Sequence, residues 1–354
     1  MQQIRYLDRL VDELAKGRPM AKGVARMIES VTKNRQSLAT LRDMTARAYG
    51  ADRVPDGEDW LEELGHGMFN VAYRLRLRDG YQAVLKIAPA AGVEVMTYEM
   101  GAMSTELTAI ALIRERTSVP VPAIDYADQS HDLCDADYFF MPYVDADNLA
   151  IIKDGLAPEL RVAYGEALGA ATAELNTIWG PAFGPLDGSG STSWRETFAS
   201  MVEDVLVDGE RRSVDLGWDY ATVRSVVAAH AHELDAVTEP RFVEWDLWDG
   251  NVMVRDGRIV GILDHERAFF GDPLIEHGFN GVLLPDFGDP AAFQRGYGMT
   301  KLTEEERRRR QLYGIHLTLI MIVETVYRKI ADPAGYVWAR EQLDQTMASF
   351  GLRR

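Results

Sequence analysis

Three polar residues in the stretch "VEWDLWDGNVMVRDGRIVGILDHE", residues 243–266, have types and a spacing that could serve phosphate chemistry. Asp246 precedes Asn251 by five residues, and Asp264 follows thirteen residues after that. An amide oxygen and a carboxylate are hard donors that suit Mg²⁺, an ion that keeps several waters and shares phosphate oxygens. Asp246 lies on the loop before them, where a carboxylate can orient a hydroxyl nucleophile or accept its proton.

A β-hairpin would bring two of these residues together. The dipeptide Asp256-Gly257, between the apolar runs "NVMV" and "IVGIL", predicts a two-residue turn. The resulting register places Asn251 opposite Ile262, with Asp264 as the diagonal neighbour on the same face. A single Asp or Asn at a strand end is commonly a turn or cap residue. All three residues at this spacing around one hairpin favour a shared ligand site instead.

A glycine-rich stretch, "LGHGMFNVAYRL" (64–75), precedes an expected strand and contains Gly65 and Gly67. A glycine pair alone could be only a turn. The loop joins two expected strands, whereas dinucleotide-binding and Walker-type loops open helices. Its position therefore favours a loop that folds over the phosphates of a nucleotide.

Lys86 interrupts the apolar run "AVLKIA" in the next expected strand. A two-residue turn at Asp79-Gly80 would pair Lys86 with Tyr73, three residues from the glycine-rich loop. A lysine among apolar neighbours needs a counter-charge, which a phosphate and a carboxylate would supply. Glu106 on the following helix is the candidate carboxylate, and Glu99 is its rival.

The elements that must position these residues fall into three ranges. Leucines at three- and four-residue spacing predict helices within residues 1–50, and alternation or apolar runs predict strands near 61–64, 71–78, 82–88 and 137–144. Expected helices follow at 103–117, 158–178, 194–208, 221–237, 303–330 and 335–349. We therefore expect an α+β protein with an N-terminal helical extension (1–55), a small antiparallel-sheet lobe (56–145) and a mostly helical lobe (146–354).

Composition excludes several classes of protein. The chain has 354 residues, a net charge of −17 and 47% hydrophobic residues, which is typical of a globular protein with two lobes. The negative charge disfavours nucleic acid as a partner, whereas it suits a cationic substrate or serves solubility alone. The single Cys134 excludes an internal disulfide, and the sequence has neither a signal peptide nor an apolar stretch long enough to span a membrane. These features favour a cytosolic location.

An ordered set of blocks over residues 61–280 resembles the aminoglycoside phosphotransferase family, a phosphotransferase enzyme family with the protein-kinase-like fold. The blocks are "GHGMFNVAYRL", "AVLKIAP", "MSTELTAIALIRERTSVPVPAI", "YFFMPYV", "WDLWDGNVMV" and "GILDHERAFFGDPLIE". The resemblance implies a two-lobed fold, with a small antiparallel-sheet N-lobe and a mostly helical C-lobe.

The resemblance also implies a role for each candidate residue. Gly65, Gly67 and Asn70 would lie in the loop over the nucleotide, and Lys86 would contact the phosphates and pair with Glu106. The hinge segment would bind adenine through Pro142, Tyr143 and Val144. Asp246 would be the catalytic residue, Asn251 and Asp264 would bind the metal, and residues 271–273 would be a structural stop.

The sequence departs from the family pattern in three places, the first two of which lie at the expected active site. Glu244-Trp245 replaces the usual His-Gly before Asp246, Trp248-Asp249 replaces a His-Pro, and Asn70 replaces the last loop glycine. The added acid and indoles could grip an amino sugar or another cation by charge and by cation–π contact. Alternatively, Trp245 packs beneath the catalytic loop.

The expected function is transfer of the γ-phosphate of ATP, with GTP as the alternative donor and Mg²⁺ as the metal, to a hydroxyl of a small molecule. An aminoglycoside-like acceptor, and with it antibiotic resistance, is the first hypothesis. A primary metabolite such as an amino alcohol, a sugar or a homoserine-like compound is the second. A nucleotide-binding scaffold without catalysis and a protein kinase are further alternatives. The N-terminal extension could cap the small lobe, narrow the substrate cleft or mediate a homodimer.

Overall fold

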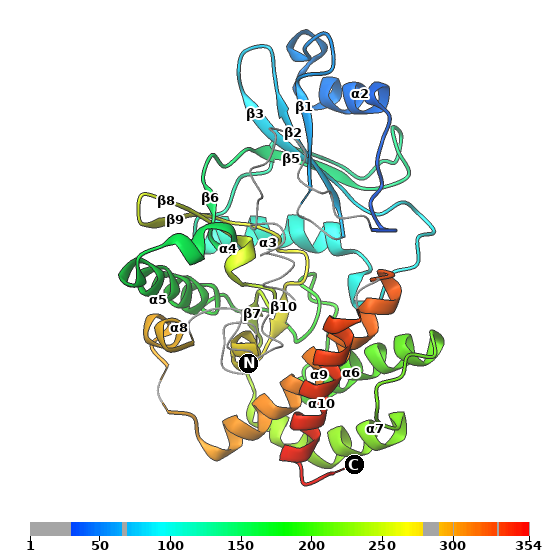
Figure 1. The fold of residues 1–354 in the computed structure, drawn as a ribbon, viewed down its shortest axis with the longest axis vertical. Coiled ribbons are helices and arrows are strands. Elements are labelled where there is room, and N and C mark those ends of the chain that lie inside the picture. Colours follow the sequence, from blue (N-terminus) through cyan, green and yellow to red (C-terminus); the bar gives the residue numbers. More distant parts are fainter. Residues whose placement is uncertain (1–29, 66–68, 279–289, 300, 331–332, 354) are drawn as a thin grey trace. The chain divides into compact units, whose positions relative to one another are not determined.

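The protein, in the form of a computed structural model, is described over residues 30–65, 69–278, 290–299, 301–330 and 333–353. The described chain divides into two compact units (Figure 1). The smaller unit comprises the chain up to Val95 together with Pro122–Asp145, and the larger unit comprises Met96–Val121 together with the chain from Ala146 onward. The helix expected at 103–117 thus belongs to the larger unit, although it falls inside the range 56–145 expected for the small lobe.

The smaller unit is built on an antiparallel sheet. Strand β2 alternates buried apolar residues with less buried polar ones: Val71, Tyr73 and Leu75 are buried, and Arg76 is exposed. The strand order is β1-β2-β3-β5-β4, and every neighbouring pair is antiparallel. The strands are β1 (Leu61–Leu64), β2 (Val71–Arg76), β3 (Gln82–Ile87), β4 (Tyr126–Asp128) and β5 (Tyr138–Pro142).

The turn between β2 and β3 corrects the predicted register. Lys86 pairs with Ala72, and Tyr73 pairs with Leu85. The connection is one residue longer than predicted because Leu77 N donates to the Tyr81 carbonyl, with Gly80 at a φ of 86° inside the loop. Three-residue hairpin loops place a left-handed residue at this position, which glycine adopts without strain.

Helix α2 (Leu38–Tyr49) packs against this sheet. Its start is set by Ser37, whose side chain accepts a hydrogen bond from Thr40 N. Leu41 and Met44 are buried in one cluster with residues of the sheet. The helical prediction for residues 1–50 holds from Leu38 to Tyr49, while residues 1–29 lie outside the described chain. Helix α2 therefore covers part of the small sheet, while the role of the N-terminal extension as a whole stays a prediction.

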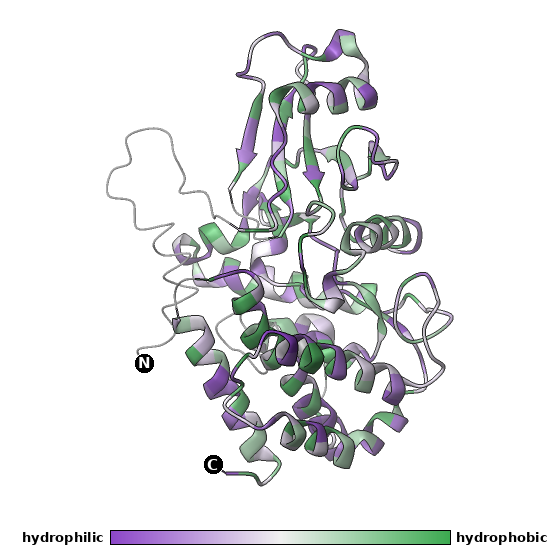
Figure 2. Ribbon diagram, turned by 90° about the vertical axis from the view of Figure 1, so that its right-hand side faces the viewer, coloured by the Kyte–Doolittle hydropathy of each residue, from purple (hydrophilic) through white to green (hydrophobic). Residues whose placement is uncertain are grey.

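The larger unit is mostly helical, and five of its six predicted helices agree with the structure to within three residues. The helix predicted at 221–237 ends at His230 and continues as a 3₁₀ turn, and the helices at Leu149–Ile152 and Pro290–Tyr297 were not predicted. Figure 2 shows that many of these helices carry hydrophobic and hydrophilic residues on different sides. The α-helices are α3 (Ala102–Arg116), α4 (Leu149–Ile152), α5 (Pro158–Leu175), α6 (Trp194–Arg211), α7 (Tyr220–His230), α8 (Pro290–Tyr297), α9 (Glu304–Tyr327) and α10 (Ala334–Ser349). Short 3₁₀ turns are η2 (Thr97–Glu99), η3 (Lys153–Gly155), η4 (Ala231–Ala236), η5 (Asp249–Asn251) and η6 (Pro273–Gly278).

Helix α9 is the centre of the larger unit. The predicted capping box is confirmed, because Thr303 and Glu306 exchange side chain to backbone hydrogen bonds. After a charged first half, the helix is buried on nearly all sides from Leu312 to Val323. This burial explains the apolar stretch at 312–327. No helix in the described part of the chain is both long and apolar enough to cross a membrane.

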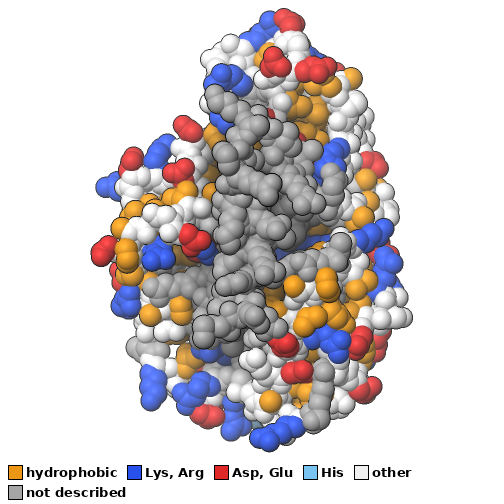
Figure 3. Space-filling view, viewed as in Figure 1, with side chains coloured by type: hydrophobic (Ala, Val, Ile, Leu, Met, Phe, Trp, Pro, Cys, Tyr) orange, Lys and Arg blue, Asp and Glu red, His pale blue; other side chains and the backbone are white. Residues whose placement is uncertain are grey.

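The charge of the surface is mixed. Figure 3 shows acidic and basic side chains scattered over the described part of one face, without one large field of a single sign. The net charge of −17 belongs to the whole sequence. The mixed charges on this face are consistent with solubility rather than with steering of a cationic partner.

Candidate active site

Two short strands of the larger unit bring Asp246 to the residues that follow Asp264. Strand β7 (Arg241–Val243) pairs antiparallel with β10 (Phe269–Gly271), and Val243 lies opposite Phe269. In an antiparallel pair, the residues after one strand and before the other meet at the same end. Asp246 therefore emerges beside the segment 264–268. A tight turn produces this position, because Trp245 has a φ of 64° and Asp246 N donates to the Glu244 carbonyl.

The predicted hairpin is present, with one correction to its register. Strands β8 (Val252–Arg255) and β9 (Arg258–Ile262) are joined by the predicted two-residue turn. A β-bulge between Met253 and Val254 then shifts the pairing by one residue, so that Val252 and not Asn251 lies opposite Ile262. Asn251 instead accepts at its carbonyl from Leu263 N, at 2.9 Å. The bulge brings Asn251 closer along the ladder to Asp264 than the predicted register did.

Asn251 joins the two loops. Its amide nitrogen donates to the backbone carbonyl of Asp246 at 2.8 Å. The amide of Asn148 on the short strand β6 (Asp147–Asn148) donates to the Gly250 carbonyl at 2.6 Å and fixes the turn before Asn251. Gly250 has no room for a side chain, because a Cβ would lie 2.3 Å from the Trp248 ring. Since its nitrogen is engaged by the loop, the amide oxygen of Asn251 is the atom suited to a ligand.

Asp264 lies in a cluster of carboxylates. Oxygens of Glu106, Asp264 and Glu266 all lie within 4.8 Å of one another, and Glu106 and Glu266 are buried. Asp264 has a φ of 70°, a left-handed conformation that Asp and Asn adopt more readily than other residues. Three hard oxygen donors at this distance suit a divalent cation such as Mg²⁺, whose charge would offset their repulsion. The sequence predicted Glu106 as the partner of Lys86, and neither Glu106 nor Glu266 was expected as a neighbour of Asp264.

Asp246 is chemically suited to accept a proton near neutral pH. Burial raises the pKa of its carboxyl to about 6, with Asp264 and Glu324 adding to this and Arg267 and Arg328 opposing it. The Nε of Arg267 lies 3.5 Å from Asp246 Oδ2. A carboxyl with a pKa near the working pH combines the ionised form with enough basicity to take a hydroxyl proton.

The acid that precedes Trp245 is structural in this geometry. Glu244 is 1% exposed and contacts His265 Nδ1 at 2.7 Å, while His265 Nε2 lies 3.0 Å from the Ile262 carbonyl. Both ring nitrogens face acceptors, so the imidazole donates from both sides as a cation. Burial lowers the pKa of His265, but the Glu244 carboxylate more than reverses this effect and the pKa is raised. The pair ties the loop of Asp246 to the loop of Asp264.

Glu276 also stabilises the tight turn at Glu244-Trp245. Its carboxyl accepts from Glu244 N at 2.6 Å and from Trp245 N at 3.0 Å, and the Asn176 amide lies at 3.3 Å. Burial raises the pKa of Glu276 to about 8, whereas these N–H donors lower it. In the stop segment, Asp272 accepts from Tyr313 Oη at 2.6 Å and from Leu274 N.

Of the two aromatic residues of the loop, Trp245 is buried and Trp248 is partly exposed. Trp245 is 3% exposed, and its ring contacts those of Tyr98 and His316. Of the two readings of Trp245, the structure has the one in which it packs beneath the catalytic loop. Trp248 is partly buried against the same core, and Asp249 lies 3.5 Å from Lys153.

His316 beneath Trp245 makes the stability of the larger unit sensitive to acid. Burial lowers the pKa of this imidazole to about 3, and its Nδ1 has no hydrogen-bond partner among the described residues. The unfolded chain takes up a proton here below a pH of about 6.5, whereas the native chain does not do so until a pH of about 3. Stability is therefore lost as the pH falls through 6.5.

We expect the replacement His316→Leu to reduce this loss. Between pH 7.5 and 5.5 the free energy of unfolding, measured with urea, should fall by about 1 kcal/mol less in the variant than in the wild type. The same replacement at the exposed His232 is the control and should keep the wild-type response. An equal response in all three proteins would contradict the assignment of a neutral buried imidazole.

The nucleotide-binding candidates of the smaller unit have the following places. Lys86 is 8% exposed on β3, Gly65 directly follows β1, and Asn70 is buried before β2, while Gly67 lies outside the described residues. In the hinge segment, Pro142 ends β5 and pairs with Ala83, and Tyr143 N donates to the Gln82 carbonyl at 3.0 Å. Val144 follows and is partly buried.

The partner of Lys86 remains a prediction, but its rival candidate is engaged elsewhere. Glu99 contacts Arg328 Nη2 at 2.8 Å and accepts from Met96 N at 2.9 Å, all within the larger unit. Glu106 instead lies in the carboxylate cluster. Glu99 is thus engaged within the larger unit, and the pairing of Lys86 with Glu106 stays a prediction.

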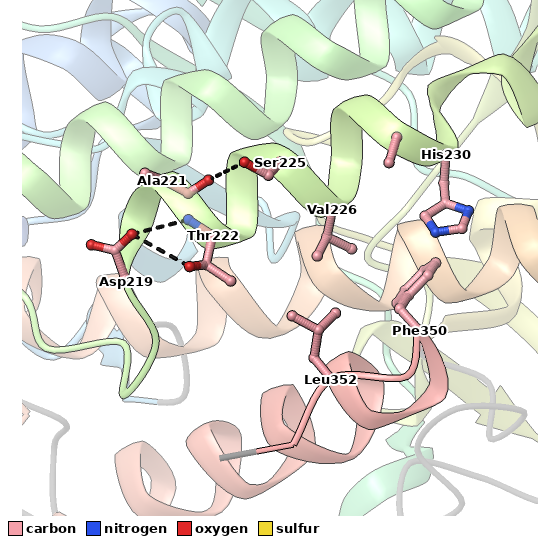
Figure 4. A pocket seen from close by; sticks show the side chains of 9 residues that line it. Asp219, Ala221, Thr222, Ser225, Val226, His230, Phe350 and Leu352 are labelled. Carbon is pink, nitrogen blue, oxygen red and sulfur yellow. Dashed lines mark hydrogen bonds between the residues drawn. The ribbon is translucent and has the colours of Figure 1, made fainter.

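A pocket elsewhere on the larger unit carries no catalytic chemistry. It lies between α7 and the chain after α10 (Figure 4). Asp219 accepts from Thr222 N as the cap of α7, and the Ser225 hydroxyl donates to the Ala221 carbonyl, so these polar groups serve the helix itself. The rest of the lining is mainly apolar, with Val226, Phe350 and Leu352 facing the hollow.

The arrangement of a small antiparallel-sheet unit and a mostly helical unit is shared with known kinases. A thermostable mutant of the aminoglycoside phosphotransferase APH(4)-Ia, solved with AMP-PNP and hygromycin B, superposes with a TM-score of 0.63 over 88% of this chain and 99% of its own, at 17% identity. A candidate fructosamine-3-kinase from Thermobifida fusca gives a TM-score of 0.61 over 87% and 99%, at 20% identity. APH(2'')-IIa, solved with streptomycin and ATP, gives 0.57 over 88% and 97%, at 15% identity. The fold is therefore protein-kinase-like.

The family is established by sequence. Residues 60–312 match the phosphotransferase enzyme family that includes aminoglycoside phosphotransferases, and the chain belongs to this family. Residues 1–26 match a family of uncharacterised proteins conserved in bacteria. None of the curated proteins matches the chain.

Proposed function

We propose that this phosphotransferase transfers the γ-phosphate of ATP to a hydroxyl of a small molecule. The observation that carries the proposal is the geometry at Asp246, a partly buried carboxyl with a pKa of about 6 on a loop held by Asn251. Such a carboxylate would accept a hydrogen bond from the acceptor hydroxyl and take its proton as the phosphoryl group is transferred. Most of the catalysis would come from positioning and charge stabilisation.

The candidate metal residues have defined places in this proposal. Asn251 would offer its amide oxygen, and Asp264 would offer its carboxylate, with Glu266 and Glu106 beside it. Mg²⁺ bound there would neutralise charge on the transferring phosphate oxygens. Lys86 and the loop 65–70 would hold the nucleotide phosphates, and the segment 142–144 would hold the base, with ATP as donor and GTP as the alternative. A cytosolic location is part of this proposal.

An aminoglycoside or a related polyhydroxylated acceptor is the first candidate because two of the superposed enzymes were solved with hygromycin B or streptomycin. One observation favours a less cationic acceptor, such as a sugar or an amino alcohol. Acids that could have gripped a polycation are already engaged: Glu244 by His265, Asp249 by Lys153 and Glu276 by backbone N–H groups. In this second candidate function, the acceptor therefore carries fewer positive charges than an aminoglycoside.

The test is the rate of ADP formation with Mg²⁺ and ATP over a panel of aminoglycosides, other hydroxylated antibiotics, amino alcohols and sugars. Wild type and Asp246→Asn are compared on every compound. We expect one acceptor class to stimulate ADP formation in the wild type and not in the variant. Nucleotide binding without stimulation by any compound would favour the non-catalytic scaffold, and absence of ATP and GTP binding would contradict the proposal.

A further inference from the structure

Arg267 is a buried cation next to the candidate catalytic carboxylate. Its side chain is 12% exposed, and its Nε lies 3.5 Å from Asp246 Oδ2. The guanidinium carbon lies 5.1 Å from the centre of the Tyr98 ring and 5.3 Å from that of Trp245. These distances are within the range of cation–π contact, and arginine combines such stacking with directed N–H groups. Two rings therefore restrict the guanidinium that faces Asp246.

A chain of ion pairs continues from Arg267 into the larger unit. Its Nη2 lies 3.9 Å from Glu324 Oε2, and Arg328 Nη2 lies 3.2 Å from the same oxygen. Arg328 also contacts Glu99 at 2.8 Å. The side chains of Arg328 and Glu99 are both 6% exposed. Charges buried to this extent persist only when each is paired, so the chain of contacts leaves Arg267 few alternative positions.

This chain of ion pairs lies partly outside the sequence that defines the family. Glu324 is on the last turn of α9 and Arg328 is the C-cap residue that follows it, both beyond the end of the family match at residue 312. Glu99 is on η2, and Arg267 is three residues after Asp264. One chain of ion pairs thus joins three segments far apart in the sequence, and it ends at the carboxylate of Asp246 through Arg267.

We propose that Arg267, held by the rings of Tyr98 and Trp245 and by Glu324, is a positioning residue that fixes the direction of the Asp246 carboxylate toward the acceptor hydroxyl. The proposal rests on the proposed phosphotransfer. A carboxylate on a tight loop can rotate, and a single N–H contact from a clamped guanidinium would select one rotamer. Because misplacement of a reacting group by about 1 Å can cost about 10²-fold in rate, this contact would be needed for turnover and not for nucleotide binding.

The test is a double-mutant cycle between Arg267→Gln and Asp246→Asn. Turnover is measured with Mg²⁺, ATP and the acceptor that gives the highest stimulated rate in the panel. We expect Arg267→Gln to lower kcat by about 10²-fold with KM for ATP changed less than about threefold. In the Asp246→Asn background the same replacement should cause no further loss, because Arg267 acts through Asp246. Arg267→Lys keeps the positive charge but lacks the planar guanidinium. Its kcat should lie between that of the wild type and that of Arg267→Gln.

A second cycle uses stability and needs no acceptor. The urea midpoints of the same four proteins should be non-additive, with the double variant losing less than the sum of the single losses. Arg308→Gln is the matched control, since Arg308 lies on α9 in an exposed ion pair with Glu304 and should change neither kcat nor the coupling. If the wild type shows no stimulated turnover, the proposed function fails, while this cycle still tests the contact.

Three results would overturn the proposal. A full further loss from Arg267→Gln in the Asp246→Asn background would mean that Arg267 acts on the substrates directly. Parallel losses of kcat, ATP affinity and urea midpoint in Arg267→Gln would mean that Arg267 only supports the fold. If Arg267→Gln does not fold, Arg267→Lys decides, and a lysine variant with wild-type kcat would show that directed contact from the fork is not required.

Discussion

Replacement of Asp246 by asparagine is expected to abolish most turnover while nucleotide binding is kept. Asparagine has the same shape but cannot accept the hydroxyl proton, so kcat should fall by about 10³-fold, within the range for loss of a general base. The wild-type rate should also fall as the pH drops through about 6, where the carboxyl becomes protonated. That acid limb should be missing from the residual activity of the variant. Stimulated ADP formation across pH and ATP affinity by calorimetry provide the two measurements.

The control for this experiment is Asp256→Asn, which makes the same replacement in the exposed turn of the hairpin. Its kcat and ATP affinity should equal those of the wild type. Turnover of Asp246→Asn at the wild-type rate would remove Asp246 from the role of base. Loss of ATP affinity in Asp246→Asn alone would instead assign it to nucleotide binding.

The second large effect is expected for Asp264→Asn, which should uncouple nucleotide binding from the metal. Asp264 has a φ of 70°, and asparagine tolerates this left-handed conformation, so the replacement removes charge with little change to the backbone. In Mg²⁺, the affinity for AMP-PNP should fall by at least about 10²-fold, the upper range for loss of an outer partner of a metal ligand. Without Mg²⁺, the affinity should be unchanged or higher, because a repelling carboxylate next to the phosphates is gone.

Calorimetric titration of AMP-PNP measures both expected changes: the loss of affinity in Mg²⁺ and the unchanged or higher affinity without Mg²⁺. Asp256→Asn is again the matched control, because Asp256 also has a positive φ, of 52°, and an Asp to Asn change there leaves the carboxylate cluster intact. Equal losses of affinity with and without Mg²⁺ would point to damage to the fold. An unchanged affinity in Mg²⁺ would place the metal on Glu106 and Glu266 without Asp264.

The departures from the family pattern at the catalytic loop have a common physical reason. Glu244, in place of the usual histidine, pairs with His265, so a carboxylate and an imidazolium join the loop of Asp246 to the loop of Asp264. Trp245 in place of glycine has a φ of 64°, which costs backbone strain in a residue with a large side chain. Its N–H donates to Glu276, and its ring packs against His316, contacts that stabilise the strained turn.

Local patterns in the sequence were sufficient for most of the secondary structure. The Asp256-Gly257 turn, the capping box at Thr303 and the alternation of β2 each depend on a few neighbouring residues, and each is present as predicted. Both hairpin registers were wrong by one residue. The three-residue loop at Gly80 and the bulge between Met253 and Val254 were missed, because an extra residue in a ladder leaves the apolar pattern around it unchanged.

The sequence by itself determined the family, the α+β class and the presence of Asp246, Asn251 and Asp264 around one hairpin, because these depend on residue types at short spacing. Only the tertiary structure decided which charged residues are partners. Glu244 was a candidate to grip the substrate until its burial against His265 was known. The pair of Glu99 and Arg328 joins residues 229 positions apart. Ion pairs between distant segments carry no local signature, since either residue alone is equally compatible with a solvated surface.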